Sequence, residues 1–198
     1  MKVKEPFSIL VAGVGGQGNL VCGRIVAEAS VYQGLRPVVG DTFGASRRGG
    51  SVLTHIRIGK QDWGPLIPVG EVDVLIGFEP LEALRAAIRY AGARTVALVS
   101  TIPVPPSNIT SGNLTYPNIV EIKKALDSLC KQVHLIDPEP VMNQARSTRV
   151  LNTYMIGVLS TLENLPIEQE NLRNAISKIL DSERDQEAFH EGVSALQP

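Results

Sequence analysis

The sequence predicts an α/β protein with a Rossmann-like, mainly parallel sheet, helices on both faces and a helical C-terminal region. Two continuous apolar runs, residues 7–12 and 72–78, have the composition of strands buried on both faces of a parallel sheet. Each run is followed by a segment with helical periodicity, the alternation that builds layered α/β folds. Only residues 42–50 separate the second predicted strand from the third, whereas a parallel crossover needs at least about 10 to 12 residues. The strand after the second one is therefore expected to be irregular or antiparallel.

The remaining elements follow from periodicity and from residues that begin or end helices. Strands are expected at residues 7–12, 37–41, 51–58, 72–78, 94–100 and 133–136. Helices are expected at residues 19–33, 79–91, 119–131, 149–164 and 168–180. Gly34 is placed to end the first helix, and Pro80 is tolerated in the first turn of the second, which Gly92 ends. Residues 101–118 hold four prolines and are expected to form a loop.

The C-terminal third carries helical signals only. We expect one domain over residues 1–198, with a helical extension from about residue 141. A chain of 198 residues can bury roughly 70 % of its unfolded surface, so it needs no disulfide or metal to fold. Residues 181–198 are rich in charge, and we expect them to dock loosely or only against a partner.

Composition argues against several classes of function. A net charge of -1 gives no basic excess for nucleic acid or an anionic membrane, so neither is expected as the main partner. No apolar run approaches the ~20 residues of a membrane span and no secretion signal is visible, so the cytoplasm is the expected location. Cys22 and Cys130 are too few for a four-iron cluster, which needs about four thiolates, and they are expected to be reduced, buried thiols. The three histidines lack zinc-ligand spacing, and we expect no metal site.

The most distinctive local pattern lies between the first strand and the first helix. Gly13-Val14-Gly15-Gly16-Gln17-Gly18 satisfies G-x-G-x-x-G in the strand-to-helix context that this motif requires. Glycines let an anion approach the backbone closely, and the helix dipole adds about 0.3 to 1 kcal/mol. A phosphate-binding site is therefore predicted at Gly13, Gly15, Gly16, Gln17 and Gly18. The alternative is a tight turn packed against its neighbours or against another subunit.

A dinucleotide-binding fold would also need an acidic residue at the end of the second strand, to hold a ribose. Asp41 lies roughly at that place. The short connection after it interrupts the ordinary nicotinamide half-domain, because it leaves no room for a crossover helix. A stand-alone NAD(P)-binding oxidoreductase is therefore kept only as an alternative.

A second unusual stretch precedes the third predicted strand. It combines flexible glycines with two guanidinium groups, which suit a phosphate or a carboxylate. The predicted binding residues are Ser46, Arg47, Arg48, Gly49 and Gly50. The alternative is a solvated loop with surface arginines. His55 and Arg57 alternate with apolar residues on the following strand and are expected to form a polar face rather than a catalytic pair.

Taken together, the two motifs resemble a known family. G-V-G-G-Q-G after a strand, followed by G-A-S-R-R-G-G-S-V-x-x-H-I-R-I-G, is similar to the gamma subunit or domain of the 2-oxoacid:ferredoxin oxidoreductases. The likeness is strongest to the beta subunit of the indolepyruvate:ferredoxin oxidoreductases, a small chain with the same domain. Residues 73–80, 152–157 and 188–192 fit the same pattern, so the resemblance covers nearly the whole chain.

The resemblance implies an accessory subunit with no catalytic residue of its own. In this family a 2-oxoacid such as pyruvate loses CO2 on thiamine diphosphate, electrons pass through iron-sulfur clusters to ferredoxin, and the acyl group goes to coenzyme A. The gamma part holds neither thiamine diphosphate nor clusters, which are expected in partner subunits, and it helps to shape the coenzyme A region. Ferredoxin would be reached only indirectly. Besides the NAD(P) enzyme, a regulatory nucleotide-binding module remains the other alternative.

Overall fold

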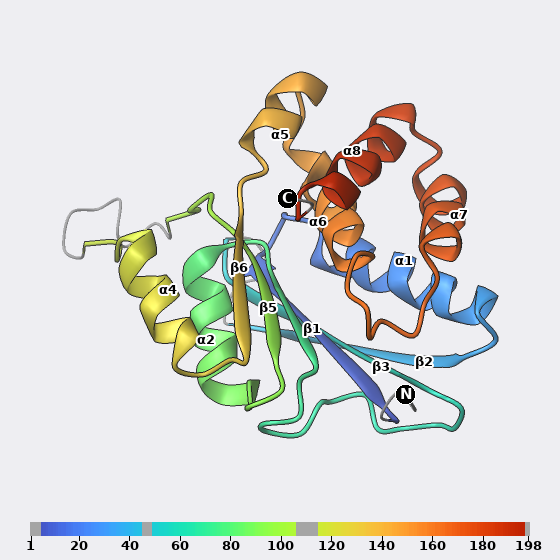
Figure 1. The fold of residues 1–198 in the computed structure, drawn as a ribbon, viewed down its shortest axis with the longest axis horizontal. Helices are drawn as coiled ribbons and strands as arrows, with labels where there is room; N and C mark the ends of the chain where they lie inside the picture. Colours follow the sequence, from blue (N-terminus) through green and yellow to red (C-terminus); the bar gives the residue numbers. More distant parts are fainter. Residues whose placement is uncertain (1–4, 45–48, 106–114, 197–198) are drawn as a thin grey trace.

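A computed structural model describes residues 5–44, 49–105 and 115–196 of the chain. These residues form one six-stranded sheet of order β2-β3-β1-β4-β5-β6 with helices on both faces (Figure 1). The strands are β1 (Phe7–Val14), β2 (Arg36–Phe43), β3 (Ser51–Gly59), β4 (Val74–Gly77), β5 (Val96–Ser100) and β6 (Gln132–Ile136). The helices are α1 (Asn19–Tyr32), α2 (Pro80–Tyr90), α4 (Ile119–Asp127), α5 (Glu139–Ala145), α6 (Leu151–Leu159), α7 (Gln169–Leu180) and α8 (Glu183–Ser194).

The strand directions agree with the predicted mixed sheet. β1, β4, β5 and β6 run parallel to one another, whereas β3 is antiparallel to both β1 and β2. β2 and β3 form a hairpin, and β3 lies between β1 and β2. The short connection between the second and third strands therefore leads to an antiparallel strand, as expected.

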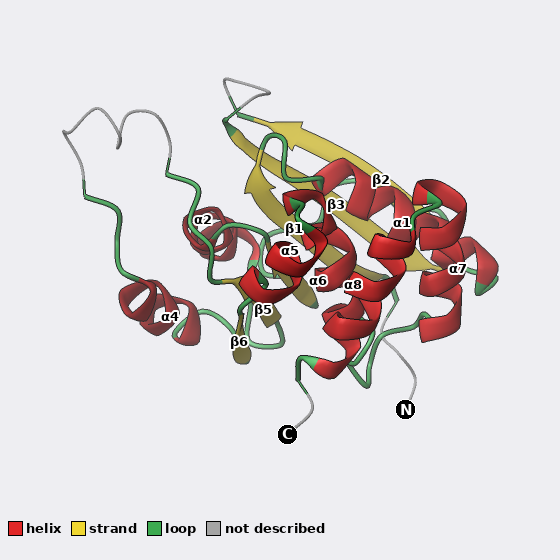
Figure 2. Cartoon of the chain, turned by 90° about the horizontal axis from the view of Figure 1, so that it is seen from above, coloured by secondary structure: helices red, strands yellow, loops and turns green. Residues whose placement is uncertain are grey.

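Two layers of helices cover the sheet. α1 packs on β1, β2 and β3, and α6, α7 and α8 continue that layer, while α2 and α4 pack on the opposite face (Figures 1 and 2). Each face has its own buried apolar cluster, one around Ile9, Ile25 and Met155 and the other around Leu10 and Ile122. The chain is thus built around the central strands, whose side chains alternate between the two clusters. No helix in the described ranges is long and apolar enough to cross a membrane.

Most predicted elements are present, with changes at their ends. The predicted helix over residues 149–164 starts only after a 3-10 turn at Thr148–Val150 and stops at Leu159. α5 precedes it as a separate short helix. The described parts of the predicted loop, residues 101–105 and 115–118, contain no helix or strand.

The expectation that the charged C-terminal segment docks loosely is wrong. α8 packs closely along α6, and two of its own residues, Ala188 and Phe189, are buried in the core. Gly157 and Gly192 face each other across the contact, where a Cβ on either one would overlap a backbone carbonyl oxygen of the facing helix. The contact is made by backbone approach, so few apolar side chains are needed to form it.

His55 and Arg57 do not form a solvent-facing polar side of β3. Both are buried beneath residues 60–70, which cross that face of the sheet. His55 Nδ1 accepts a hydrogen bond from Ile67 N at 3.3 Å, and burial lowers the pKa of the imidazole. Arg57 donates to Gly64 O at 2.9 Å and lies 5.4 Å from the centre of the Trp63 ring. The two polar side chains hold this segment against the sheet.

Candidate functional site

The candidate site lies where β1 and β4 end side by side. The two strands are neighbours and parallel, but β1 leads into α1 on one face and β4 leads into α2 on the other. In open α/β sheets, ligands bind at the carboxyl ends of strands where successive connections diverge in this way. The glycine loop, residues 13–18, is located at this point.

The glycine loop ends at the N-terminus of α1, which has no side-chain cap among the described residues. Gly16 and Gly18 have φ values of 112° and 94°, a region that side chains other than glycine rarely adopt. Gly18 is the N-cap of α1, no side chain caps the helix, and its first turn holds no acidic residue. The first backbone N–H groups of α1 therefore have no partner within the helix and favour a negative charge.

Gln17 connects the ends of the two strands. Its Oε1 accepts a hydrogen bond from Val14 N at 2.7 Å, and its Nε2 donates to Phe78 O at 3.1 Å. Both polar atoms of this amide thus bind the protein's own backbone. Gln17 fixes the shape of the glycine loop, and of the predicted loop residues it has the least capacity left for a ligand.

The structure brings the described parts of the two sequence motifs together. Gly15 N donates to Gly50 O at 2.9 Å, and Gly49 N donates to Gly15 O at 3.4 Å. Gly49 has a φ of 71°, which glycine adopts without strain. Ser46, Arg47 and Arg48 lie outside the described residues, in the connection between Gly44 and Gly49. The hairpin end that carries them is hydrogen-bonded directly to the glycine loop.

Two asparagines that the sequence analysis did not select also contact this loop. Asn19 is 2 % exposed, donates through Nδ2 to Val52 O at 3.1 Å, and leaves its Oδ1 without a hydrogen-bond partner. Asn152, in the first turn of α6, is 5 % exposed, and its Nδ2 lies 3.0 Å from the position of a Cβ on Gly18. Asn152 belongs to residues 152–157, a segment that resembles the family, and this resemblance was the one sequence signal that could have pointed to it.

A buried carboxylate lies on the other side of the site. Glu79 follows β4 directly, caps α2 by accepting a hydrogen bond from Glu82 N at 2.7 Å, and is 1 % exposed. It also accepts hydrogen bonds from the Tyr116 hydroxyl and from Val104 N. Burial raises the pKa of Glu79, although these hydrogen bonds oppose the shift. Both described ends of the proline-rich loop are therefore held by one carboxylate.

Asp41 does not occupy the place of a ribose-binding acid. Because β3 separates β2 from β1, Asp41 belongs to a strand about 10 Å from β1. Its Oδ1 accepts a hydrogen bond from Thr54 Oγ1 at 2.6 Å. The chain therefore has the glycine-rich turn of a dinucleotide-binding site, but the sheet order leaves it without an acidic residue beside that turn at the end of β2.

The two thiols are poorly suited to act as metal ligands. Burial raises the pKa of Cys22 to about 12, and burial together with Asp127 raises the pKa of Cys130 to about 11. Both thiols are therefore protonated at neutral pH, whereas clusters and zinc bind thiolates. Across the described part of the chain, no group of three or more His, Cys, Asp and Glu residues is arranged to hold a metal ion.

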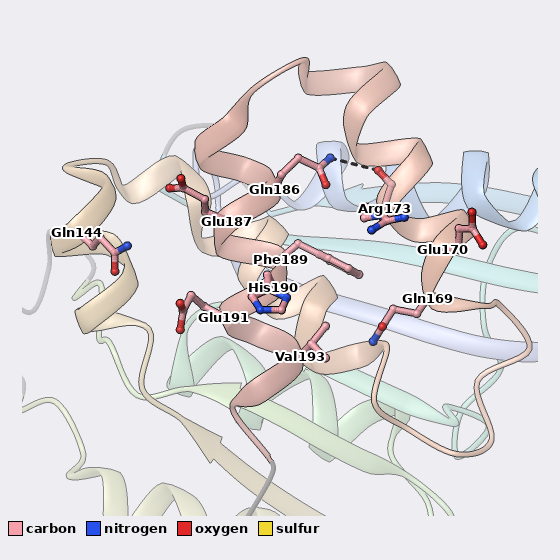
Figure 3. A pocket seen from close by; sticks show the side chains of 10 residues that line it. All are labelled: Gln144, Gln169, Glu170, Arg173, Gln186, Glu187, Phe189, His190, Glu191 and Val193. Atoms are coloured by element: carbon pink, nitrogen blue, oxygen red, sulfur yellow. Dashed lines mark hydrogen bonds between the residues drawn. The ribbon is translucent and has the colours of Figure 1, made fainter.

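A separate groove of about 670 Å³ lies on the helical layer between α5, α7 and α8 (Figure 3). Its charged lining consists of Glu170, Glu187 and Glu191 together with Arg173 and His190. Of the predicted binding residues, those that the structure describes do not line this groove. It is an open polar surface, distinct from the site at the sheet edge.

The fold and the loop define a small α/β subunit with an anion-suited sheet edge, and comparison with known proteins identifies its family. The sequence matches the pyruvate ferredoxin/flavodoxin oxidoreductase family over residues 8–196, and the chain belongs to this family. It is 35 % identical to the indolepyruvate oxidoreductase subunit IorB of Archaeoglobus fulgidus, covering 89 % of this chain and 87 % of that subunit. It is 32 % identical to the IorB subunit of Thermococcus kodakarensis, covering 96 % of each chain.

Solved structures share the fold. A pyruvate oxidoreductase subunit from Thermotoga maritima aligns with a TM-score of 0.69 at 19 % identity, over 96 % of this chain and 94 % of that one. A 2-oxoglutarate:ferredoxin oxidoreductase from Magnetococcus marinus, solved with 2-oxoglutarate, coenzyme A and succinyl-CoA, aligns with a TM-score of 0.70 at 22 % identity. The alignment covers 97 % of this chain but 31 % of that longer one.

These comparisons confirm the family, the fold class and the assignment to a small accessory subunit of 2-oxoacid:ferredoxin oxidoreductases. They give no support to a stand-alone NAD(P) enzyme or a regulatory nucleotide-binding module.

Proposed function

We propose that this chain is the accessory subunit of an indolepyruvate-type 2-oxoacid:ferredoxin oxidoreductase in the cytoplasm. Relatives at 32–35 % identity that are named indolepyruvate oxidoreductase subunits support the choice of substrate. Thiamine diphosphate and the iron-sulfur clusters belong to partner subunits, through which electrons reach ferredoxin. The number of cysteines supports this division, because Cys22 and Cys130 are fewer than the roughly four thiolates that a four-iron cluster needs.

Within that enzyme, the sheet-edge site binds the phosphate groups of coenzyme A, the acyl acceptor. The observation that carries this proposal is the pair of backbone hydrogen bonds that joins Gly15 to Gly49 and Gly50. They place an uncapped helix terminus beside Gly49 and Gly50, the residues that follow the two arginines in the sequence. Backbone N–H groups and guanidinium groups both suit a phosphate. The predicted residues are Gly13, Gly15, Gly16, Gln17, Gly18, Ser46, Arg47, Arg48, Gly49 and Gly50.

Coenzyme A fits the residues that are present. Gly16 is open to a close approach, since apart from its chain neighbours no atom of the described residues lies within 4 Å of the position a Cβ would take. The backbone of this loop would bind and orient the phosphates, while the arginines would balance their charge. The chain thus positions the acyl acceptor, and bond making takes place on partner subunits.

The subunit assignment is tested by coexpressing the chain with the neighbouring thiamine diphosphate-type subunit. We expect the two subunits to copurify and the complex to reduce ferredoxin when a 2-oxoacid is supplied. This chain alone should not reduce ferredoxin. A chain that remains alone at micromolar concentration contradicts the assignment.

The ligand is tested in that complex with the double variant Arg47→Ala/Arg48→Ala. We expect the KM for coenzyme A to rise at least tenfold with copurification unchanged, because the variant loses two cations. The control is Arg173→Ala/Arg184→Ala, which removes two exposed arginines from α7 and α8. Loss of copurification with an unchanged KM would instead assign the arginines to carboxylates of a partner subunit.

A further inference from the structure

We infer that Asn152 is a further binding residue of this site, contributed by α6 to the N-terminus of α1. The inference rests on the proposed function, because it adds a hydrogen-bond donor for the phosphate oxyanion that the glycine loop holds. Neither the glycine motif nor the arginine motif contains this residue.

The side chain of Asn152 is held in one orientation. Its Oδ1 accepts a hydrogen bond from Thr153 N at 2.7 Å, and reversing the amide would point two donors at each other. Nδ2 is therefore the atom that faces Gly18, 3.0 Å from the position of a Cβ on that residue. Within the described parts of the chain, Nδ2 has no hydrogen-bond partner, although the residue is 5 % exposed.

The N-terminus of α1, beside Asn152, also has polar groups without a hydrogen-bond partner among the described residues. Gly18 cannot cap α1 through a side chain, and the first turn of α1 holds no carboxylate. Asn19, in that turn, leaves its buried Oδ1 unpartnered. This oxygen is closed off from solvent, so the amide atom that a ligand can reach is Nδ2 of Asn152. Polar atoms on side chains as buried as this one are nearly always hydrogen-bonded, so the unpartnered donor marks a place that a ligand completes. The oxygen of a phosphate group is a hydrogen-bond acceptor and matches this free donor.

A second hydrogen bond fixes the backbone that presents Asn152. Thr153 is fully buried, and its Oγ1 lies 2.9 Å from Asp185 Oδ1 and 3.0 Å from Val150 O. This contact joins the start of α8 to the first turn of α6. Asn152 is therefore carried by a rigid helix pair, which suits a residue that must hold a fixed distance to a ligand.

The competing explanation is that Asn152 only fills space against Gly18. Asn152→Asp separates the two, because a carboxylate has almost the same shape and keeps the acceptor for Thr153 N. The variant exchanges one donor for a negative oxygen at the helix terminus. A space-filling role would be preserved, whereas anion binding would lose a donor and gain a repulsion.

The experiment measures binding of inorganic pyrophosphate and of coenzyme A to the full chain by calorimetry at pH 7.5. We expect Asn152→Asp to weaken both at least tenfold with little change in melting temperature. Asn164→Asp is the matched control, since this exposed asparagine follows the far end of α6, a helix about 13 Å long. It should bind like the wild type.

A direct readout uses the side-chain NH2 resonances of Asn152 in the wild-type chain. Pyrophosphate should shift these resonances at the same concentration that saturates the calorimetric signal. Unchanged resonances, or an Asn152→Asp variant that binds as tightly as the wild type, would overturn the inference and leave the subunit assignment intact. A wild-type chain that binds neither probe would also overturn it, while copurification decides the subunit assignment separately.

Discussion

Glycine serves opposite purposes in two regions of this subunit. In the glycine loop, Gly16 has a φ of 112°, and among the described residues beyond its chain neighbours no atom lies within 4 Å of the position a Cβ would take. At the crossing of α6 and α8, Gly157 and Gly192 have ordinary helical φ values, but a Cβ on either one would meet backbone of the other helix. The loop glycine provides conformation and open access, whereas the helical glycines provide close contact. A glycine count alone does not distinguish a site from a packing contact.

The largest expected effect is at the helix crossing. Gly192→Ala should lower the free energy of unfolding by about 3 kcal/mol, because the added methyl group forces two backbones apart. For a chain of this size, the melting temperature should fall by roughly 6 to 12 °C. Calorimetric melting measures the change. A variant that becomes more stable by about 1 kcal/mol, as helix propensity alone predicts, would contradict the packing role.

Gly18→Ala should give the next largest loss of stability, because Gly18 has both a positive φ and a close contact with another residue. Its φ of 94° is strained for alanine, and its Cβ would lie 3.0 Å from Asn152 Nδ2. We expect a loss of about 2 kcal/mol in urea unfolding together with weaker pyrophosphate binding. Equal binding by this variant and the wild type would separate Gly18 from the anion site.

Gly16→Ala should cost less stability than Gly18→Ala but should clearly weaken the binding of coenzyme A. Its φ predicts a cost of roughly 1 to 2 kcal/mol, and its added methyl group points into open space where the ligand approaches. Gly34→Ala is the matched control, because Gly34 has a φ of 75°, equally open surroundings and a place beyond the far end of α1. Both variants should unfold alike in urea, and only Gly16→Ala should weaken binding of coenzyme A. Equal binding by both would place Gly16 outside the site.

The smallest effect concerns the buried carboxylate beside the loop. Burial raises the pKa of Glu79 in the folded protein above its ordinary value of 4.5, so the folded chain binds more protons than the unfolded chain between these values. The associated stability is complete below the ordinary pKa and is lost as the pH rises through the folded pKa. Glu79→Gln does not titrate. The free energy of unfolding of the wild type, relative to this variant, should therefore fall as the pH rises from 4 to 8, whereas parallel urea profiles would contradict the shift.

Connection lengths made much of the fold predictable. The nine residues between the second and third predicted strands, 42–50, could not hold a crossover helix, and the observed hairpin is the result. The two motifs could be placed at one edge because each adjoins the sheet. Their direct hydrogen bonding depends on β3 lying next to β1, and local sequence does not encode that neighbour.

Other features depend on contacts that leave no local pattern. His55 and Arg57 were expected to form a polar face of their strand, and the burial of that face could not be predicted because residues 60–70, which cover it, have no periodicity. α8 looked loosely attached because it has few apolar residues, and the close backbone contact of Gly157 with Gly192 adds to the burial of Ala188 and Phe189. Asn152 was missed as a site residue because it meets Gly18 only after α6 has packed beside α1.

The packing of α8 on α6 also has a consequence for biosynthesis. The first turn of α6 borders the glycine loop, and Thr153 in that turn is joined to Asp185 of α8. The loop leaves the ribosome well before α8 does, yet its surroundings are complete only when residues near 190 have followed. Translation that stops within α8 would leave the glycine loop intact and the helix pair beside it incomplete.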